Sequence, residues 1–441
     1  MMAVLKNIGT LVLLFIALPI NLVIVMISLA IGVVTAPFRQ KKAIDNPKNI
    51  LITGGKMTKA LQLARSFHQA GHNVFLVETH KYWLSGHRFS NAVKGFYTVP
   101  APEKDADGYS QELLKIVRNK NIDAFVPVSS PVASYYDSVA GTVLSEHCEV
   151  IHFSPEITQM LDDKFKLCDK ARSLGLSAPK SFHITNPQQI LDFDFQADGS
   201  RYILKSIRYD SVSRLDMTQF PFEGMEEYVK KLPISEENPW TMQEFIAGQE
   251  YCTHSTVRNG KIRLHCCSAS SPFQVNYEHL DKPEIYAWVE QFVKELNLTG
   301  QISFDFMQTA DGTVYPIECN PRTHSAITMF YNHPGLADAY LKDSTGENEC
   351  PIEPLAESKP TYWLYHEIWR LTEIRSLSDL QTWTNKMVKG TDALLQVNDP
   401  LPFLTVPHWQ ITLLLLENLR KLKGWVRIDF NIGKLVEIGG D

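Results

Sequence analysis

The sequence has little of what marks a metal–thiolate or a nucleic-acid-binding protein. Its seven cysteines include no CxxC pair and no zinc-type spacing, so reduced thiols in a cytosolic compartment fit best. The 441 residues carry a net charge of −6, which gives no reason to expect a nucleic acid as partner. A Walker motif is also missing, because Ile50 and Met57 flank Gly54–Lys56 where glycine and a hydroxyl residue are needed. The same stretch is not a GxGxxG motif.

One long stretch, Asn7 to Phe38, has no charged residue and is rich in leucine, isoleucine and valine. About 20 apolar residues suffice to span a bilayer, and the stretch is too long for a signal peptide. Arg39, Lys41 and Lys42 follow at once, which predicts that the rest of the chain is cytoplasmic. We expect membrane attachment through residues 8–36, as a spanning or a re-entrant segment, with a buried core helix as the alternative.

Residues 46–153 predict a small doubly wound parallel-sheet domain. A buried strand runs into the glycines at Gly54, and a helix and the strand VFLVET follow, which together form a βαβ unit. Ligands of such sheets gather at the carboxyl ends of the strands. The polar residues expected there, each of which plain loop surface would also explain, are Glu78, Tyr82, Arg88, Ser129, Ser130 and Tyr136.

The stretch Gly300–Arg322 predicts a hairpin with a two-residue turn at Asp311-Gly312. That register places Asp305 directly opposite Glu318. Opposed side chains lie about 5 Å apart and like charges there repel, so a hard divalent cation or a shared proton must offset the repulsion. A surface hairpin with two carboxylates is the alternative.

The same hairpin places Asn320 opposite Ser303, beside the two carboxylates. An asparagine carbonyl is an oxygen ligand suited to Mg²⁺. Arg322 shares this face if the strand continues, where it would hold a phosphate oxygen. Pro316 cannot donate to the ladder, so we expect an edge-like or bulged second strand.

Two lysines and an acid precede the hairpin in a fixed order. Lys164 falls within one helix predicted over 154–175, for which a solvated surface lysine is the plain alternative. Lys205 ends the apolar strand 202–204, where it suits a phosphate. The two lysines are 41 residues apart, and Gln243-Glu244-Phe245-Ile246 and then Glu250 follow them.

This order and spacing resemble the ATP-grasp superfamily over roughly residues 48–340. The resemblance implies an α/β and α+β fold: an ATP-grasp domain at 154–345 in two lobes, behind the doubly wound domain and an anchor at 1–45. The first metal ligand is often Glu in the superfamily and is Asp here. The implied roles are phosphate binding by Lys164 and Lys205, adenine binding by Gln243, Glu244, Phe245 and Ile246, ribose binding by Glu250, Mg²⁺ (or Mn²⁺) ligation by Asp305, Glu318 and Asn320, and catalysis by Arg322.

Longer stretches narrow the resemblance, above all IECNPRTHSAITMFYNHP and HKYWLSGHRFS. They look like the mycosporine-glycine synthases, the ligases of mycosporine-like amino acid biosynthesis. This implies ATP-dependent joining of glycine to 4-deoxygadusol through a phosphorylated enol, with His324 and Ser325 at the substrate. The alternatives are another ATP-grasp ligase that uses an acyl phosphate, and a nucleotide-binding regulatory protein.

The C-terminal extension, 346–441, carries no motif for chemistry. Trp409–Trp425 predicts a basic amphipathic helix that would lie on a membrane or, as we expect, pack on the catalytic body.

Overall fold

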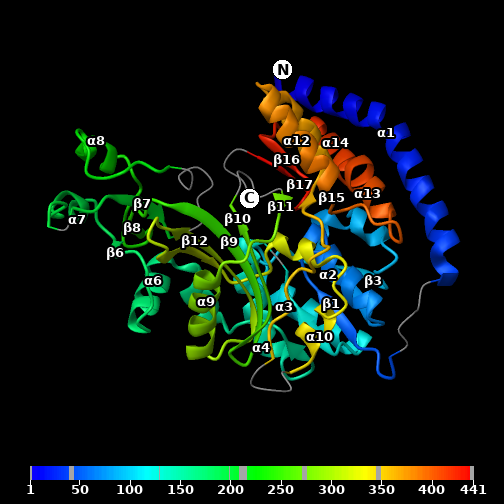
Figure 1. Ribbon diagram of the computed structural model, residues 1–441, viewed down its shortest axis with the longest axis horizontal. Helices are drawn as coiled ribbons and strands as arrows, with labels where there is room; N and C mark the ends of the chain where they lie inside the picture. Colours follow the sequence, from blue (N-terminus) through cyan, green and yellow to red (C-terminus); the bar gives the residue numbers. More distant parts are fainter. Residues whose placement is uncertain are drawn as a thin grey trace.

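The computed structural model describes residues 2–38, 44–128, 130–197, 199–207, 216–270, 276–343 and 349–437 (Figure 1). Arg39, Lys41, Lys42 and Ser129 lie outside the described residues.

A five-stranded parallel sheet, in the order β3-β2-β1-β4-β5, forms the first layer of the molecule. Successive residues of the central strand feed opposite faces: Ile50 and Ile52 pack with α2, and Leu51 packs with α3 and α4. The prediction of a doubly wound sheet is therefore confirmed. The elements are β1 (Asn49–Ile52), α2 (Thr58–Gln69), β2 (Asn73–Thr79), β3 (Gly95–Val99), α3 (Ala106–Lys120), β4 (Ala124–Val126), α4 (Pro131–Leu144) and β5 (Glu149–Val150).

Two antiparallel sheets follow, a small one ordered β6-β8-β7 and a larger one ordered β10-β9-β12-β13. Trp288 and Phe292 of α9 stack on each other and pack edge-on against Phe304 and Phe306 of β12, which fixes the larger sheet on its helix. The elements are β6 (Ser181–Ile184), β7 (Tyr202–Ser206), β8 (Trp240–Glu244), β9 (Gln249–Arg258), β10 (Lys261–Ala269), α9 (Pro283–Glu295), β12 (Gly300–Gln308) and β13 (Val314–Asn320), with the short helices α7 (Gln188–Leu191) and α8 (Met225–Val229) beside the small sheet.

The single helix predicted over 154–175 is wrong: it is broken at Asp163 into α5 (Pro155–Asp162) and α6 (Lys164–Ser173). Asp163 has an extended backbone, and its carboxylate accepts hydrogen bonds from the backbone N–H groups of Phe165 and Lys166 at 3.0 and 3.1 Å. A side chain that caps the next helix competes with continuation of the first one. Lys164 therefore starts α6 instead of lying inside a helix.

The C-terminal extension packs across the doubly wound layer and holds α1 (Met2–Thr35) along its outer side (Figure 1). The predicted helix over Trp409–Trp425 ends early, because α14 stops at Arg420 and Leu422 takes a left-handed backbone. The elements of the extension are β14 (Thr361–Tyr362), α11 (Leu364–Arg370), α12 (Leu377–Lys389), β15 (Thr391–Asp392), α13 (Leu401–Thr405), η8 (Val406–Ile411), α14 (Thr412–Arg420), β16 (Arg427–Asp429) and β17 (Lys434–Val436). Three elements that precede it in the chain are β11 (Asn276–Tyr277), which pairs with β14, η6 (Ser325–Phe330) and α10 (Leu336–Leu341).

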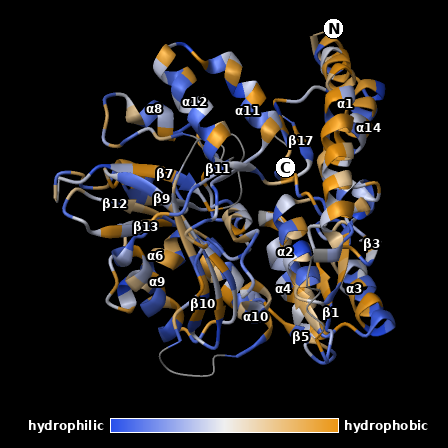
Figure 2. Ribbon diagram, turned by 45° about the vertical axis from the view of Figure 1, so that its right-hand side comes forward, coloured by the Kyte–Doolittle hydropathy of each residue, from blue (hydrophilic) through white to orange (hydrophobic). Residues whose placement is uncertain are grey.

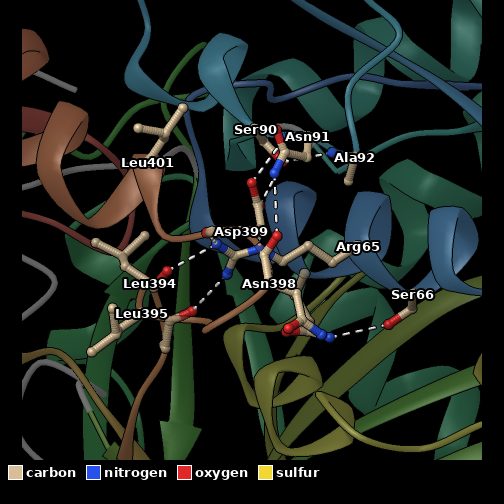
Figure 3. Close-up of polar contacts among 12 residues, drawn as sticks. Arg65, Ser66, Ser90, Asn91, Ala92, Leu394, Leu395, Asn398, Asp399 and Leu401 are labelled. Carbon is tan, nitrogen blue, oxygen red and sulfur yellow. Dashed lines mark hydrogen bonds and ion pairs between the residues drawn. The ribbon is translucent and has the colours of Figure 1, made fainter. Parts of the chain in front are cut away.

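A buried ion pair joins this extension to the doubly wound layer (Figure 3). Arg65 of α2 donates from Nε to Asp399 Oδ2 at 2.7 Å and from Nη2 to the carbonyl oxygen of Leu394 at 2.9 Å. The carboxylate of Asp399 also accepts from Ser90 Oγ at 2.7 Å and from the backbone N–H of Asn91 at 2.8 Å. The extension is thus fixed to the sheet domain by a fully bonded polar cluster.

The N-terminal helix α1 is apolar along nearly its whole length, as its colour in Figure 2 shows. Within the described residues it is the one helix long and apolar enough to cross a membrane.

Candidate functional site

The hairpin β12–β13 brings the predicted acidic pair together. Asp305 pairs with Glu318 and Ser303 with Asn320, as predicted. The two-residue turn is wrong, however: Thr309 pairs with Thr313 around a three-residue loop, and Gly312 takes the left-handed backbone that such loops need. A bulge between Asp305 and Phe306 then corrects the register by one residue.

That bulge falls at Pro316 and Ile317, where the sequence predicted an irregular strand. Proline has no N–H to donate to the ladder, so an unpaired residue next to it costs little. Without the bulge, the three-residue loop would place Ile317 opposite Asp305 and move Glu318 and Asn320 off their partners on β12.

Asp305 is the most strongly perturbed acid of the hairpin. Burial, the opposed Glu318 and nearby Glu250 raise its pKa well above the ordinary value. Among the described residues its Oδ1 atom is buried and has no hydrogen-bond partner. Such an atom needs either a proton or a cation.

Lysine and arginine side chains face the two acids. Lys164 Nζ lies 3.4 Å from Glu318 Oε2. Burial alone would lower the pKa of Lys164, but Glu318 and Asp162 outweigh it, so the pKa is raised and the lysine stays charged. Within the described part of the chain, Arg322 Nη1 is buried without a hydrogen-bond partner, so it remains available for an anion.

The second lysine, Lys205, approaches from the small sheet. Its Nζ donates to the backbone carbonyl of Asp216 at 2.9 Å. Burial, and then the charge of Lys164, lower its pKa. The two lysines therefore come from helix α6 and from strand β7 into one electrostatic environment, which favours an anionic ligand between them.

The segment Gln243–Ile246 contains the end of β8, which stops at Glu244. The Gln243 side chain is buried and donates to Cys168 Sγ and to the carbonyl of Ile317, both at 3.5 Å. The backbone N–H groups of Glu244 and Phe245 donate to the carbonyls of Lys180 and Arg201 at 2.8 and 2.7 Å, and Ile246 is half-buried.

Gln243 thus connects the small sheet to α6 and to the bulge of β13. Glu250 starts β9 and accepts from Ser270 Oγ at 2.7 Å. Its charge contributes to the raised pKa of Asp305, which places it on the acidic side of the cleft.

The donor set fits Mg²⁺. In the described parts of the chain, no three side chains of His, Cys, Asp or Glu cluster closely enough to hold a metal ion. Mg²⁺ is commonly bound through one or two carboxylates plus phosphate and water oxygens. The protein therefore needs to supply no more ligands than Asp305, Glu318 and the amide oxygen of Asn320. The unpartnered Oδ1 of Asp305 is the observation that supports this fit.

Comparison with known proteins identifies the architecture. No protein-family model matches the chain, and no curated protein matches it. Two structures of N5-carboxyaminoimidazole synthetase from Staphylococcus aureus match with a TM-score of 0.51, at 14% and 15% identity, over 73% and 72% of this chain and 82% of theirs. An L-amino acid ligase from Bacillus licheniformis aligns over 69% of this chain and 72% of its own, at 16% identity and a TM-score of 0.47. The chain has an ATP-grasp fold.

A cavity of about 1960 Å³ adjoins the ATP-grasp cleft. Of the predicted site residues, Asn320, Arg322, His324 and Ser325 line it, whereas the two lysines and the carboxylate pair do not. The cavity and the predicted nucleotide cleft therefore meet at Asn320 and Arg322. Three further parts of the chain complete the wall: α1, the strand ends of the doubly wound sheet, and the C-terminal extension from Tyr365 to Arg370 and from Trp425 to Asn431.

The strand ends contribute a charged cluster. Lys56 Nζ lies 3.2 Å from Glu78 Oε1 and 4.2 Å from the ring centroid of Tyr82. Glu78, Tyr82 and Ser130 were predicted at these ends and do line the cavity. Arg88 instead donates to the carbonyl of Trp83, and Tyr136 packs into the core with α3.

Lys56 and Lys59 are residues that sequence reasoning missed as site residues. Lys59 is buried on the first turn of α2, and its Nζ donates to the carbonyl of Thr323 at 2.7 Å. Burial, with the charges of Arg322 and Lys56, lowers its pKa well below the ordinary value. Their position just after β1 was the available signal, since ligands gather at such strand ends.

His324 and Ser325 lie at the cavity but also hold its backbone. His324 Nδ1 accepts from the backbone N–H of Ala326 at 3.3 Å and caps η6. Burial, with Lys59 and Arg322, lowers its pKa to about 3, so the imidazole is neutral. Ser325 Oγ accepts from Asn431 Nδ2 at 2.7 Å, which ties η6 to the C-terminal extension.

Proposed function

We propose that the protein is an ATP-dependent, ADP-forming C–N ligase that joins glycine to 4-deoxygadusol. The observation that carries the ligase assignment is the meeting of a charged cleft with a large cavity at Asn320 and Arg322, in a chain with an ATP-grasp fold. ATP in the cleft would place its terminal phosphate where the cavity begins. The identity of the two substrates rests on the resemblance of the sequence stretches to the mycosporine-glycine synthases.

Different residues of the cleft bind different parts of ATP. Lys164 and Lys205 bind phosphate oxygens, Glu250 binds the ribose, and Gln243, Glu244, Phe245 and Ile246 form the adenine segment. The buried Gln243 side chain positions this segment, because its amide is already bonded to Cys168 and Ile317. Mg²⁺, or Mn²⁺, held by Asp305, Glu318 and Asn320 would neutralise phosphate charge.

The reaction then needs no protein nucleophile. The γ-phosphoryl group passes to the enolate oxygen of the ring, breaking the bond to the β-phosphate oxygen, and ADP forms. The glycine amine adds to the carbon that bears this oxygen, and the phosphate leaves with the bonding electrons while the ammonium loses its proton. Arg322, with its unbonded Nη1, stabilises the phosphate during both steps.

The protein is further proposed to be attached to a membrane through residues 8–36 of α1, with its catalytic part in the cytoplasm. An apolar helix of this length whose outer side is exposed supports attachment. No nucleic acid takes part.

The test measures ADP release and product mass with full-length protein in detergent. ADP should form only when glycine and 4-deoxygadusol are both present, and mass spectrometry should find their condensation product. ADP release with an ordinary carboxylate and no cyclohexenone would replace this substrate assignment by the acyl-phosphate alternative.

A matched pair of lysine variants tests the ligase assignment apart from the substrates. Lys164→Met removes the ammonium that faces Glu318, and we expect ATP binding to weaken at least about tenfold. Lys166→Met, on the same helix turn but largely exposed, should leave ATP binding unchanged. Equal ATP affinity in all three proteins would refute the assignment of the cleft.

A further inference from the structure

The N-terminal helix α1 presents two chemically different surfaces. Asn7, Leu14, Asn21 and Ser28 recur every seven residues and are buried against the body. The opposite side is apolar and open: Leu5, Val12, Phe15, Val23, Met26 and Val33 are each at least half exposed. The helix contains no acidic residue, and Lys6, its one charged residue, donates to the carbonyl of Trp425 at 2.9 Å.

Polar contacts hold the buried stripe to the C-terminal extension over most of the helix. Asn7 Nδ2 donates to the carbonyl of Lys423 at 2.9 Å, and Asn7 Oδ1 accepts from Trp425 Nε1 at 3.1 Å. About four turns before the end of α1, a second set forms: Asn21 Nδ2 donates to Tyr365 Oη at 2.9 Å and to the carbonyl of Phe403 at 3.3 Å.

Gly32 continues this contact to the last turn. A Cβ atom there would lie 3.2 Å from the carbonyl oxygen of Val397, so the backbone of α1 is still against the body. Figure 1 shows α1 following the outer side of the C-terminal helices in the same way. If α1 left the body to cross a bilayer, Asn7 and Asn21 would lose these partners in hydrocarbon, where an amide without hydrogen-bond partners is strongly unfavourable.

Crossing the bilayer together with the body is unfavourable as well. At 1.5 Å per residue α1 is about 50 Å long, against about 30 Å for the hydrocarbon core. Its first turns lie beside the backbone of Lys423, and the ion pair of Lys423 with Glu437 would have to enter or cross the membrane with it.

The charges at both ends of the helix instead suit one lipid surface. Arg420, Lys421 and Lys423 form a basic stretch whose last member lies next to the start of α1, and the sequence continues after the end of α1 with Arg39, Lys41 and Lys42. Basic residues of this kind are attracted to anionic headgroups. An apolar face between two basic ends matches a helix that lies along the interface.

We propose that α1 lies in the plane of an anionic membrane surface, with its open apolar face in one leaflet and both ends on the cytoplasmic side. This inference rests on the membrane attachment proposed above and is independent of the ligase chemistry. Leu13, Ile16 and Ile20 of α1 line the cavity, so the in-plane helix also places one cavity wall at the membrane surface.

The decisive experiment is protease protection of the full chain with an epitope tag at each end, expressed in bacteria. In inside-out inner-membrane vesicles, whose cytoplasmic face is outward, protease should remove both tags without detergent. An N-terminal tag that is protected until detergent is added means that α1 spans the bilayer and overturns the proposal. Recovery of the protein outside the membrane fraction also overturns it.

Vesicle binding tests the apolar face itself. With vesicles of phosphatidylcholine and phosphatidylglycerol, Phe15→Asp combined with Met26→Asp should weaken co-sedimentation at least about tenfold, since both side chains would enter the leaflet. Val143→Asp, at an exposed apolar position of α4, is the matched control and should bind like the unchanged protein. Equal binding of the double variant would refute the assignment of this face. Neither assay depends on turnover, so the result is separate from the fate of the proposed reaction.

Discussion

Asp305 faces Glu318 across β12 and β13, and Lys164 Nζ lies 3.4 Å from the Glu318 carboxylate. The pair lacks one partner, because Asp305 Oδ1 is buried and has no hydrogen-bond partner in the described structure. A divalent cation would complete it.

Asp305→Asn should therefore separate function from stability. We expect turnover to fall at least about 100-fold, as when a group that stabilises transition-state charge is removed. The raised pKa means that the metal-free acid stabilises the fold below its ordinary pKa of 3.8, and that this contribution is lost as pH rises through the raised value. At neutral pH without metal the variant should melt at the same or a higher temperature than the unchanged protein. A large fall in melting temperature would make Asp305 a structural residue instead.

The Arg65–Asp399 pair should be a major support of the C-terminal extension. Arg65→Met leaves the Asp399 carboxylate buried without its cation, so unfolding in urea should show a loss of about 3–5 kcal/mol. Arg65→Met combined with Asp399→Leu removes the uncompensated charge, and it should be less destabilised than the single variant. If the double variant loses the sum of the two single effects, the two residues are not coupled.

Acid should destabilise the protein through histidines that are buried in the neutral form. Burial lowers the pKa of His152 to about 4, while the unfolded chain titrates near 6.5. Stability is therefore complete above pH 6.5 and is lost as pH falls toward 4, by roughly 3 kcal/mol for this residue. His152→Gln keeps a donor for the carbonyl of Ser134 and should shift the acid midpoint to lower pH. The exposed His68→Gln is the control, and equal midpoints for both variants would contradict the assignment.

Removing α1 should affect the acceptor site and spare the nucleotide site. Residues 2–38 supply one wall of the cavity but no contact to the lysines or the acid pair. A protein without them should show an increased KM for the acceptor, by at least about tenfold if the wall positions it, and an unchanged KM for ATP. An equal change in both values would indicate a general loss of the fold.

The sequence was informative where short-range rules decide the structure. Alternation along the strands placed Asp305 against Glu318 correctly, and the βαβ pattern gave the doubly wound sheet. The prediction of one helix was wrong at Asp163. An aspartate can either continue a helix or cap the start of the next one, and the sequence pattern does not distinguish the two. The domain boundaries and the roles of the site residues stay predictions.

The cavity could not be predicted from these short-range rules. Its wall combines α1, the residues after β1 and the segments around Tyr365 and Trp425, which are far apart in the chain and meet only through packing. No periodicity in the sequence marks such a meeting. Lys59 shows the limit clearly, because its partner is the backbone of Thr323 and not a side chain that a motif would include.

The bulge of β13 lies between the turn of the hairpin and the predicted metal ligands Glu318 and Asn320. An unpaired residue at Ile317 absorbs a one-residue difference, so the turn loop around Gly312 can change length without displacing Glu318 or Asn320. In this chain, removing one loop residue together with the bulge residue would therefore keep Asp305 opposite Glu318.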